Sequence, residues 1–169
     1  MRPDPIIDLA SLDFSKVVAD KAALLAANPQ RFEMEQLDAI VHFDKEANVV
    51  VGYKDVRHDE FWARGHMPGF PLMPGVLMCE AGAQLVSYYI CAAGLKASDF
   101  VVFGGMDNVR FRGIVRPGTR LILSGKGLRL DKRRSVFHVQ GHVGKSLVFH
   151  ADIIGMQLNM GTPSAVEEG

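Results

Sequence analysis

An almost entirely apolar helix in the middle of the chain constrains the fold more than any other feature of this 169-residue sequence. The predicted helix covers residues 74–93, begins at a proline and is followed by a glycine, and carries apolar side chains on nearly every side. Glu80, Gln84 and Ser87 interrupt this surface within two turns, which argues against a membrane span. Such a helix is typical of a protein core, so the rest of the chain must enclose it.

Sequence with the alternating pattern of β-strands lies on both sides of this helix. The predicted strands are, in order, 35–44, 49–57, 100–112, 119–130, 134–143 and 147–158. Short turns separate the first two strands from each other and the last four from one another, so neighbours within each set are expected to run antiparallel. The pattern predicts an α+β fold in which an antiparallel sheet wraps around the central helix. Because the length suits one core, residues 1–169 are predicted to form a single domain.

The two ends of the chain are predicted to be peripheral. Residues 1–30 are interpreted as an N-terminal segment with one helix, from Phe14 to Ala27. Ser11 or Asp13 would cap that helix, because short polar side chains accept hydrogen bonds from the first free amides. Residues 162–169 are expected to form a frayed tail.

Composition narrows the partners and the compartment. Nineteen basic and 19 acidic residues cancel, so no nucleic-acid partner is indicated. Cys79 and Cys91 would lie roughly 18 Å apart along the predicted helix, too far for a disulfide within one chain. The N-terminal sequence has no signal-peptide pattern, and we therefore expect a cytoplasmic protein.

Groups near the start of the central helix have the chemistry of an acid–base site. His66 lies in a loop rich in proline and glycine, residues 58–73, and a neutral imidazole can accept a proton at physiological pH. The amides of Gly75 and Val76 lack partners within the helix and could hold an oxygen that becomes negative. Glu80 could donate a proton to a leaving hydroxyl group. Together these groups describe the elimination of water from a carbonyl compound.

Each of these residues also has an ordinary structural interpretation. A histidine that follows glycine is often a simple loop residue, and Glu80 could be a packing compromise or the partner of Arg64. Three further histidines, His138, His142 and His150, are interpreted as sheet-surface residues. His138 and His142 would be roughly 13 Å apart on one strand, too far to share a metal ion. No metal site is predicted.

The loop and helix together carry a long motif. Residues 66–77 read His-Met-Pro-Gly-Phe-Pro-Leu-Met-Pro-Gly-Val-Leu, and residues 80–84 read Glu-Ala-Gly-Ala-Gln. This motif resembles the signature of the hot-dog-fold (3R)-hydroxyacyl-acyl-carrier-protein dehydratases of the FabA/FabZ type. Weaker similarity occurs at 28–32, and also at 105–112 and 115–119, so the resemblance covers roughly residues 24–158.

The resemblance implies a hydro-lyase of fatty-acid or related acyl-chain biosynthesis. Such an enzyme converts a 3-hydroxyacyl thioester into a trans-2-enoyl thioester. By similarity, His66 would take the α-proton, and the amide of Gly75, with Val76 beside it, would bind the thioester carbonyl. Glu80 would assist departure of the 3-hydroxyl group, and Gln84 would hold the carboxylate of Glu80. No metal, redox cofactor or other cofactor is implied.

The resemblance also implies partners. The substrate would be carried by acyl carrier protein (ACP) through its phosphopantetheine arm. Two subunits would pair, with His66 of one facing Glu80 of the partner subunit. Whether three such dimers assemble into a hexamer is left undecided by the resemblance. Two other functions fit the same fold: an acyl thioesterase in which Glu80 activates water, and a non-catalytic protein that binds acyl thioesters. The chain departs from the family pattern at Gln30, Met67 and Val102, which leaves the acyl length open.

Overall fold

The computed structural model describes residues 2–131 and 133–159, and the sheet and helices lie within these ranges. The strands are β1 (Ala39–Asp44), β2 (Val49–Asp55), β3 (Phe100–Phe111), β4 (Arg120–Leu130), β5 (Arg134–Val143) and β6 (Ser146–Leu158). The helices are η1 (Leu9–Ser11), α1 (Lys21–Ala27), η2 (Phe32–Met34) and α2 (Gly75–Ala92), of which η1 and η2 are short 3₁₀ helices. The tail predicted for 162–169 lies outside the described residues.

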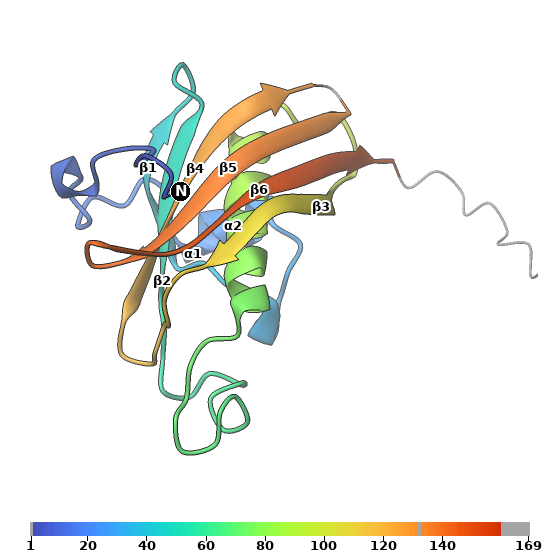
Figure 1. Ribbon diagram of the computed structural model, residues 1–169. Helices are drawn as coiled ribbons and strands as arrows, with labels where there is room; N and C mark the ends of the chain where they lie inside the picture. Colours follow the sequence, from blue (N-terminus) through green and yellow to red (C-terminus); the bar gives the residue numbers. More distant parts are fainter. Residues whose placement is uncertain (1, 132, 160–169) are drawn as a thin grey trace, which may run out of the picture.

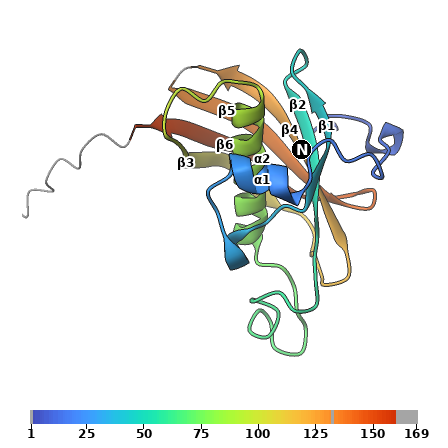
Figure 2. The ribbon, with the colours of Figure 1, turned by 180° about the vertical axis from the view of Figure 1, so that it is seen from behind.

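Six antiparallel strands of the described chain form one sheet that curves around α2, as Figures 1 and 2 show. The strand order is β1-β2-β4-β5-β6-β3, so β1 and β3 form the two edges of the sheet. Helix α2 packs against β2, β3, β4, β5 and β6. This arrangement is a hot-dog fold, and it confirms the predicted α+β class with a central helix.

Helix α2 is enclosed because small residues allow the sheet to come close to it. A Cβ atom at Gly82 would lie only 2.8 Å from Cδ1 of Ile153 and 3.2 Å from Cγ1 of Val139. By length and composition α2 is apolar enough to cross a membrane, and no other helix of the described residues is. However, 67% of it is buried inside the molecule, as is typical of a core helix.

The prediction for the N-terminal helix is wrong at its start. Helix α1 begins only at Lys21, where the side chain of Asp20 accepts a hydrogen bond from the amide of Ala23. The residues before it pair with the sheet instead, because the amide and carbonyl of Ala19 both bond to the backbone of Ile40. Backbone groups used in this pairing cannot also form helical bonds.

Strand β1 is also shorter than predicted, since it begins at Ala39 and not at residue 35. The segment before it forms η2, and the amide of Gln36 then donates to the side chain of Gln84 on α2. The backbone of Gln36 is therefore bonded to helix α2 and not to a neighbouring strand.

The N-terminal segment covers the outer face of the sheet, the face away from α2. The side chain of Gln140 accepts a hydrogen bond from the amide of Ile6 and donates one to the carbonyl of Asp4. The same segment borders His142, and both His142 and His150 are only 8% exposed, so their prediction as surface residues is wrong. His138 is half-buried and lies 2.7 Å from Asp152 (Nδ1 to Oδ1). Sequence alternation placed His138 and His142 on one face of a strand but did not reveal what covers that face.

Replacing Gly82 with leucine should destabilise the fold, because the larger side chain would be forced against Ile153 and Val139. The expected loss is about 1–3 kcal/mol of the free energy of unfolding, measured by urea denaturation. Ala92→Leu, at an exposed position of the same helix, is the control and should change stability by less than about 0.5 kcal/mol. A Gly82→Leu protein as stable as the wild type would contradict this packing.

Acid should weaken the fold through His142. Burial, with a smaller contribution from Arg2, lowers the pKa of His142 below its usual value of 6.5. The unfolded chain therefore binds a proton at a higher pH than the folded chain does, and stability is lost as pH falls below about 6.5. His142→Gln should reduce the loss of unfolding free energy between neutral and mildly acidic pH. His58→Gln, at an exposed position, should leave that loss unchanged.

Candidate functional site

His66 is held in one orientation by the loop that leads into α2. Its Nδ1 lies 2.9 Å from the carbonyl oxygen of Leu72, and its backbone amide donates to the carbonyl of Trp62 at 2.8 Å. A carbonyl oxygen can only accept, so Nδ1 carries the hydrogen in this bond. The neutral ring therefore has its lone pair on Nε2, where it can take a proton from a substrate.

Buried contacts fix this otherwise irregular loop to the body of the protein. Trp62 is 4% exposed, and the amide of Met73 donates to the carbonyl of Val115 at 2.7 Å. At the start of the loop, Lys54 and Glu60 form a buried ion pair of 2.9 Å. The position of His66 is therefore set by tertiary contacts and not by regular secondary structure.

Gly75 and Val76 form the first turn of α2, which packs against the edge strand. A Cβ atom at Gly75 would lie 2.8 Å from the ring of Phe111 on β3, so only glycine fits there without displacing the ring. No hydrogen bond to another described residue uses the amides of Gly75 or Val76. The side chain of Val76 is 68% exposed. Free amides at a helix start can bind a carbonyl oxygen or an anion.

Glu80 is half-buried and is held by two side-chain amides. Nε2 of Gln30 donates to Oε1 of Glu80 at 3.1 Å, and Nε2 of Gln84 donates to the same oxygen at 2.8 Å. The sequence suggested Arg64 as a possible partner, but the hydrogen bonds of Glu80 in the described chain come from these two glutamines. Both bonds go to one oxygen, which leaves Oε2 available for a substrate.

Gln84 is itself fixed on both ends of its amide. Its Nε2 also donates to the carbonyl of Met34 at 2.6 Å, and its Oε1 accepts from the amide of Gln36 at 2.8 Å. The side chain is only 3% exposed, so it cannot rotate without leaving these groups unpaired. The segment around η2 thereby orients the carboxyl group of Glu80 through Gln84.

Sequence reasoning missed Gln30 as a member of the site. It noted this residue only as a departure from the family pattern, whereas the structure places its amide against Glu80. The available signal was the position of Gln30 within 28–32, a segment that already resembles the family. Because that segment lies 50 positions from Glu80, no local pattern could connect the two residues.

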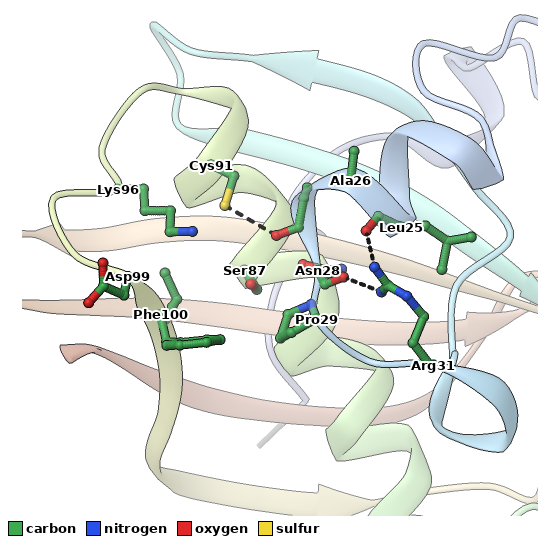
Figure 3. Close-up of a pocket in the computed structure, with 12 residues that line it drawn as sticks. Leu25, Ala26, Asn28, Pro29, Arg31, Ser87, Cys91, Lys96, Asp99 and Phe100 are labelled. Atoms are coloured by element: carbon green, nitrogen blue, oxygen red, sulfur yellow. Dashed lines mark hydrogen bonds between the residues drawn. The ribbon is translucent and has the colours of Figure 1, made fainter. Parts of the chain in front are cut away.

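A narrow cavity adjoins Glu80 between α2 and the strands β3 and β6. Its volume is about 40 Å³, and its lining consists of Gln30, Glu80, Ala83, Val86, Ser87, Val101, Val102, Phe103, Ile153, Ile154 and Gly155. A second cavity of about 140 Å³ lies beyond it, between α2 and the end of α1 (Figure 3). Ser87 and Val101 line both, so the two cavities are neighbours.

The structure brings some of the predicted site residues together and keeps others apart. Glu80 and Gln84 are hydrogen-bonded, but within the described residues no hydrogen bond joins His66 to Glu80. Neither does the described chain contain a group of three or more His, Cys, Asp or Glu side chains that could hold a metal ion. Burial raises the pKa of the neighbouring Cys79 to about 11, so this thiol stays protonated at neutral pH and is a poor nucleophile.

Comparison with known proteins places this geometry in a family. A family model described as the FabA-like domain matches residues 28–152. The chain is 37% identical over 139 residues to the 3-hydroxyacyl-[acyl-carrier-protein] dehydratase FabZ of Syntrophobacter fumaroxidans, covering 80% of this chain and 91% of that protein. It is 34% identical over 126 residues to the protein of the same name from Desulforamulus reducens, covering 75% and 88%.

A solved structure supports the same conclusion at the level of the fold. The dehydratase heterocomplex ApeI:P from Xenorhabdus doucetiae contains a chain that superposes with a TM-score of 0.68 at 16% identity. The match covers 81% of this chain and 91% of that chain. With the family model covering most of the sequence, and with dehydratase relatives above 30% identity over most of their length, this chain belongs to the FabA-like family.

Proposed function

We propose that this protein is a 3-hydroxyacyl-ACP dehydratase, a hydro-lyase that forms a trans-2-enoyl thioester. The observation that carries the proposal is the pairing of two features. His66 has its proton-accepting Nε2 left open by the bond at Nδ1, and Glu80 has Oε2 left open by the two bonds at Oε1. The similarity to FabZ proteins supports the same reaction.

In the proposed reaction, Nε2 of His66 removes the proton next to the thioester carbonyl. The bond from Nδ1 to the carbonyl of Leu72 keeps the ring oriented and stabilises the positive charge that it gains. Electrons shift onto the carbonyl oxygen, which becomes negative. The free amides at Gly75 and Val76 can bind this oxygen, and one such donor is typically worth about 3 kcal/mol of barrier.

Glu80 then completes the elimination. Its Oε2 gives a proton to the 3-hydroxyl group, which leaves as water as the carbon–carbon double bond forms. Gln30 and Gln84 bind only Oε1, so they orient the carboxyl group without competing for the oxygen that reacts. His66 afterwards holds the α-proton taken from the substrate, and Glu80 lacks the proton that left with the water. Transfer of one proton from His66 to Glu80 therefore restores both groups.

We further propose that the site is completed by a second subunit. Within the described chain His66 and Glu80 do not bond to each other, and β3 leaves one sheet edge open beside the site. Apolar side chains are exposed along this strand, with Phe103 at 47%, Met106 at 37% and Phe111 at 51%. Pairing of two β3 edges would cover them and satisfy the free backbone groups.

Such a homodimer would act on substrates carried by the phosphopantetheine arm of ACP. The two described cysteines are free thiols, which suits a reducing cytoplasm.

The thioesterase alternative leaves His66 without a role, and a purely binding protein would not need the open Nε2. A trimer of dimers stays a prediction, which sedimentation of the purified protein can test.

The proposed activity can be tested directly with 3-hydroxyacyl-ACP. The wild type should produce the conjugated enoyl thioester, followed by its ultraviolet absorbance. His66→Ala and Glu80→Gln should each lower kcat by about 10²–10⁴-fold, because each removes a proton-transfer group. His58→Ala, an exposed loop histidine, is the control and should retain activity. Release of free thiol in place of enoyl product would instead favour the thioesterase, and inactivity on both ACP and coenzyme A thioesters would overturn the proposal.

Mixed dimers test whether the two catalytic groups come from different subunits. A dimer of one His66→Ala chain and one Glu80→Gln chain, purified through two different tags, would contain one doubly damaged site and one intact site. Its activity should return to about half that of the wild type, whereas each variant alone is nearly inactive. A site built within one subunit predicts no recovery. The control is a mixed dimer of two His66→Ala chains, which should stay inactive under either arrangement.

A further inference from the structure

The cavity at the far end of the site has a polar character that dehydration does not require. It lies between the second half of α2, the end of α1 and the start of β3, and Figure 3 shows its lining side chains. Its polar members are Asn28, Arg31, Ser87, Cys91, Lys96 and Asp99. None of these takes part in the proton transfers proposed for His66 and Glu80.

The position of this cavity relative to the reacting groups makes it the end of the acyl path. The amides that would bind the thioester carbonyl lie at the start of α2, and Glu80 follows one turn later. Ser87 lies seven residues beyond Glu80, roughly 10 Å along the helix axis. Ser87 and Val101 line both this cavity and the one beside Glu80. The phosphopantetheine arm would lie toward the start of α2, so an acyl chain would run toward Ser87.

Two neutral polar groups in this cavity have unused hydrogen-bonding capacity. Asn28 is 6% exposed, and its Nδ2 donates to the carbonyl of Gln84 at 3.1 Å. Its Oδ1 is buried and accepts no hydrogen bond from the described chain. Ser87 is 7% exposed, and no hydrogen bond links its hydroxyl group to a described residue. A plain alkyl chain in the cavity would leave both groups unsatisfied, which is unfavourable.

The charged groups of the cavity do not select a charged ligand. The guanidinium group of Arg31 already donates to the carbonyls of Leu25, Asn28 and Gln30. Lys96 and Asp99 bring one charge of each sign to the lining, at the side opposite Arg31 in Figure 3. The thiol of Cys91 lies 3.4 Å from the carbonyl of Ala27 and acts as donor, and burial raises its pKa so that it stays neutral.

We infer that the distal cavity binds a hydroxyl group on the far part of the acyl chain, and that Asn28 and Ser87 determine this specificity. A hydroxyl group can donate to Oδ1 of Asn28 and also exchange a hydrogen bond with Ser87. The preferred substrate class is then a 3-hydroxyacyl thioester with a second hydroxyl group near its distal end. This inference rests on the proposed dehydratase function and adds the class of acyl chain.

Matched substrate pairs test the inference. The pairs are 3-hydroxyacyl-ACP thioesters of about eight to twelve carbons, each with and without a terminal hydroxyl group, which span the roughly 10 Å from Glu80 to Ser87. One chain length should place the terminal hydroxyl group at Ser87. For that pair, the wild-type enzyme should have a kcat/KM about tenfold higher on the hydroxylated substrate than on the alkyl substrate. The four-carbon 3-hydroxybutyryl thioester, too short to reach the cavity, separately reports on the basic reaction.

Variants then connect the preference to the two side chains. Asn28→Leu should reduce the ratio of the two kcat/KM values to about one, because it removes the free acceptor. It also removes the bond to Gln84, so Ser87→Ala, which deletes a single oxygen atom, is the second variant. Ser146→Ala, on an exposed position at the start of β6, is the matched control and should keep the tenfold ratio.

The outcomes separate this inference from the function on which it rests. A tenfold preference that Ser87→Ala lowers and Ser146→Ala retains supports the inference. If 3-hydroxybutyryl-ACP is dehydrated but alkyl chains react as well as hydroxylated ones at every length, the inference is wrong and the proposed function stands. The inference is also wrong, and the proposed function again stands, if Asn28→Leu and Ser87→Ala both keep the preference for the hydroxylated substrate. If no thioester is dehydrated at all, the proposed function fails and the inference with it.

Discussion

The enclosure of α2 by the sheet is the constraint on which the rest of this structure depends. The helix is apolar on nearly every side, so it must be covered on all of them, and the covering sheet can approach closely because Gly82 presents no side chain to β5 and β6. A helix so enclosed has few places for a polar group. Two of its polar side chains, Glu80 and Gln84, lie where segments outside the helix supply hydrogen bonds.

The segment around η2 supplies those hydrogen bonds. It passes over α2 before β1 begins. There the backbone amide of Gln36 donates to the side-chain oxygen of Gln84, and the backbone carbonyl of Met34 accepts from its side-chain nitrogen. Gln84 in turn binds Glu80, which also receives a bond from Gln30. Together these bonds stabilise a carboxyl group next to a narrow cavity, and they leave its Oε2 without a bond to the protein's own donors. In Glu80, therefore, Oε1 accepts the hydrogen bonds that hold the side chain, and Oε2 is left available to the substrate.

His66 is prepared by different means. Its loop has no regular structure, and the ring is oriented by a carbonyl from the same loop while Trp62 and Met73 anchor the loop to the core. The acid and the base therefore depend on separate parts of the fold. A functional site that needs both is naturally completed where two surfaces meet, and the exposed apolar residues of the edge strand β3 provide such a surface. The same strand lines the cavities beyond Glu80, so the acyl path and the proposed subunit contact share one element.

The sequence alone determined the elements whose signal is local. The apolar stretch of α2, the strand alternation after it, and the spacing of His66, Gly75 and Glu80 were all readable because period and motif depend on near neighbours. The tertiary structure decided what depends on contact across the chain. Ala19 pairs with Ile40 and so delays the start of α1, Gln30 reaches Glu80 from 50 positions away, and the N-terminal segment borders the buried His142. Each of these outcomes was settled by hydrogen bonds or burial between distant segments, which no local pattern encodes.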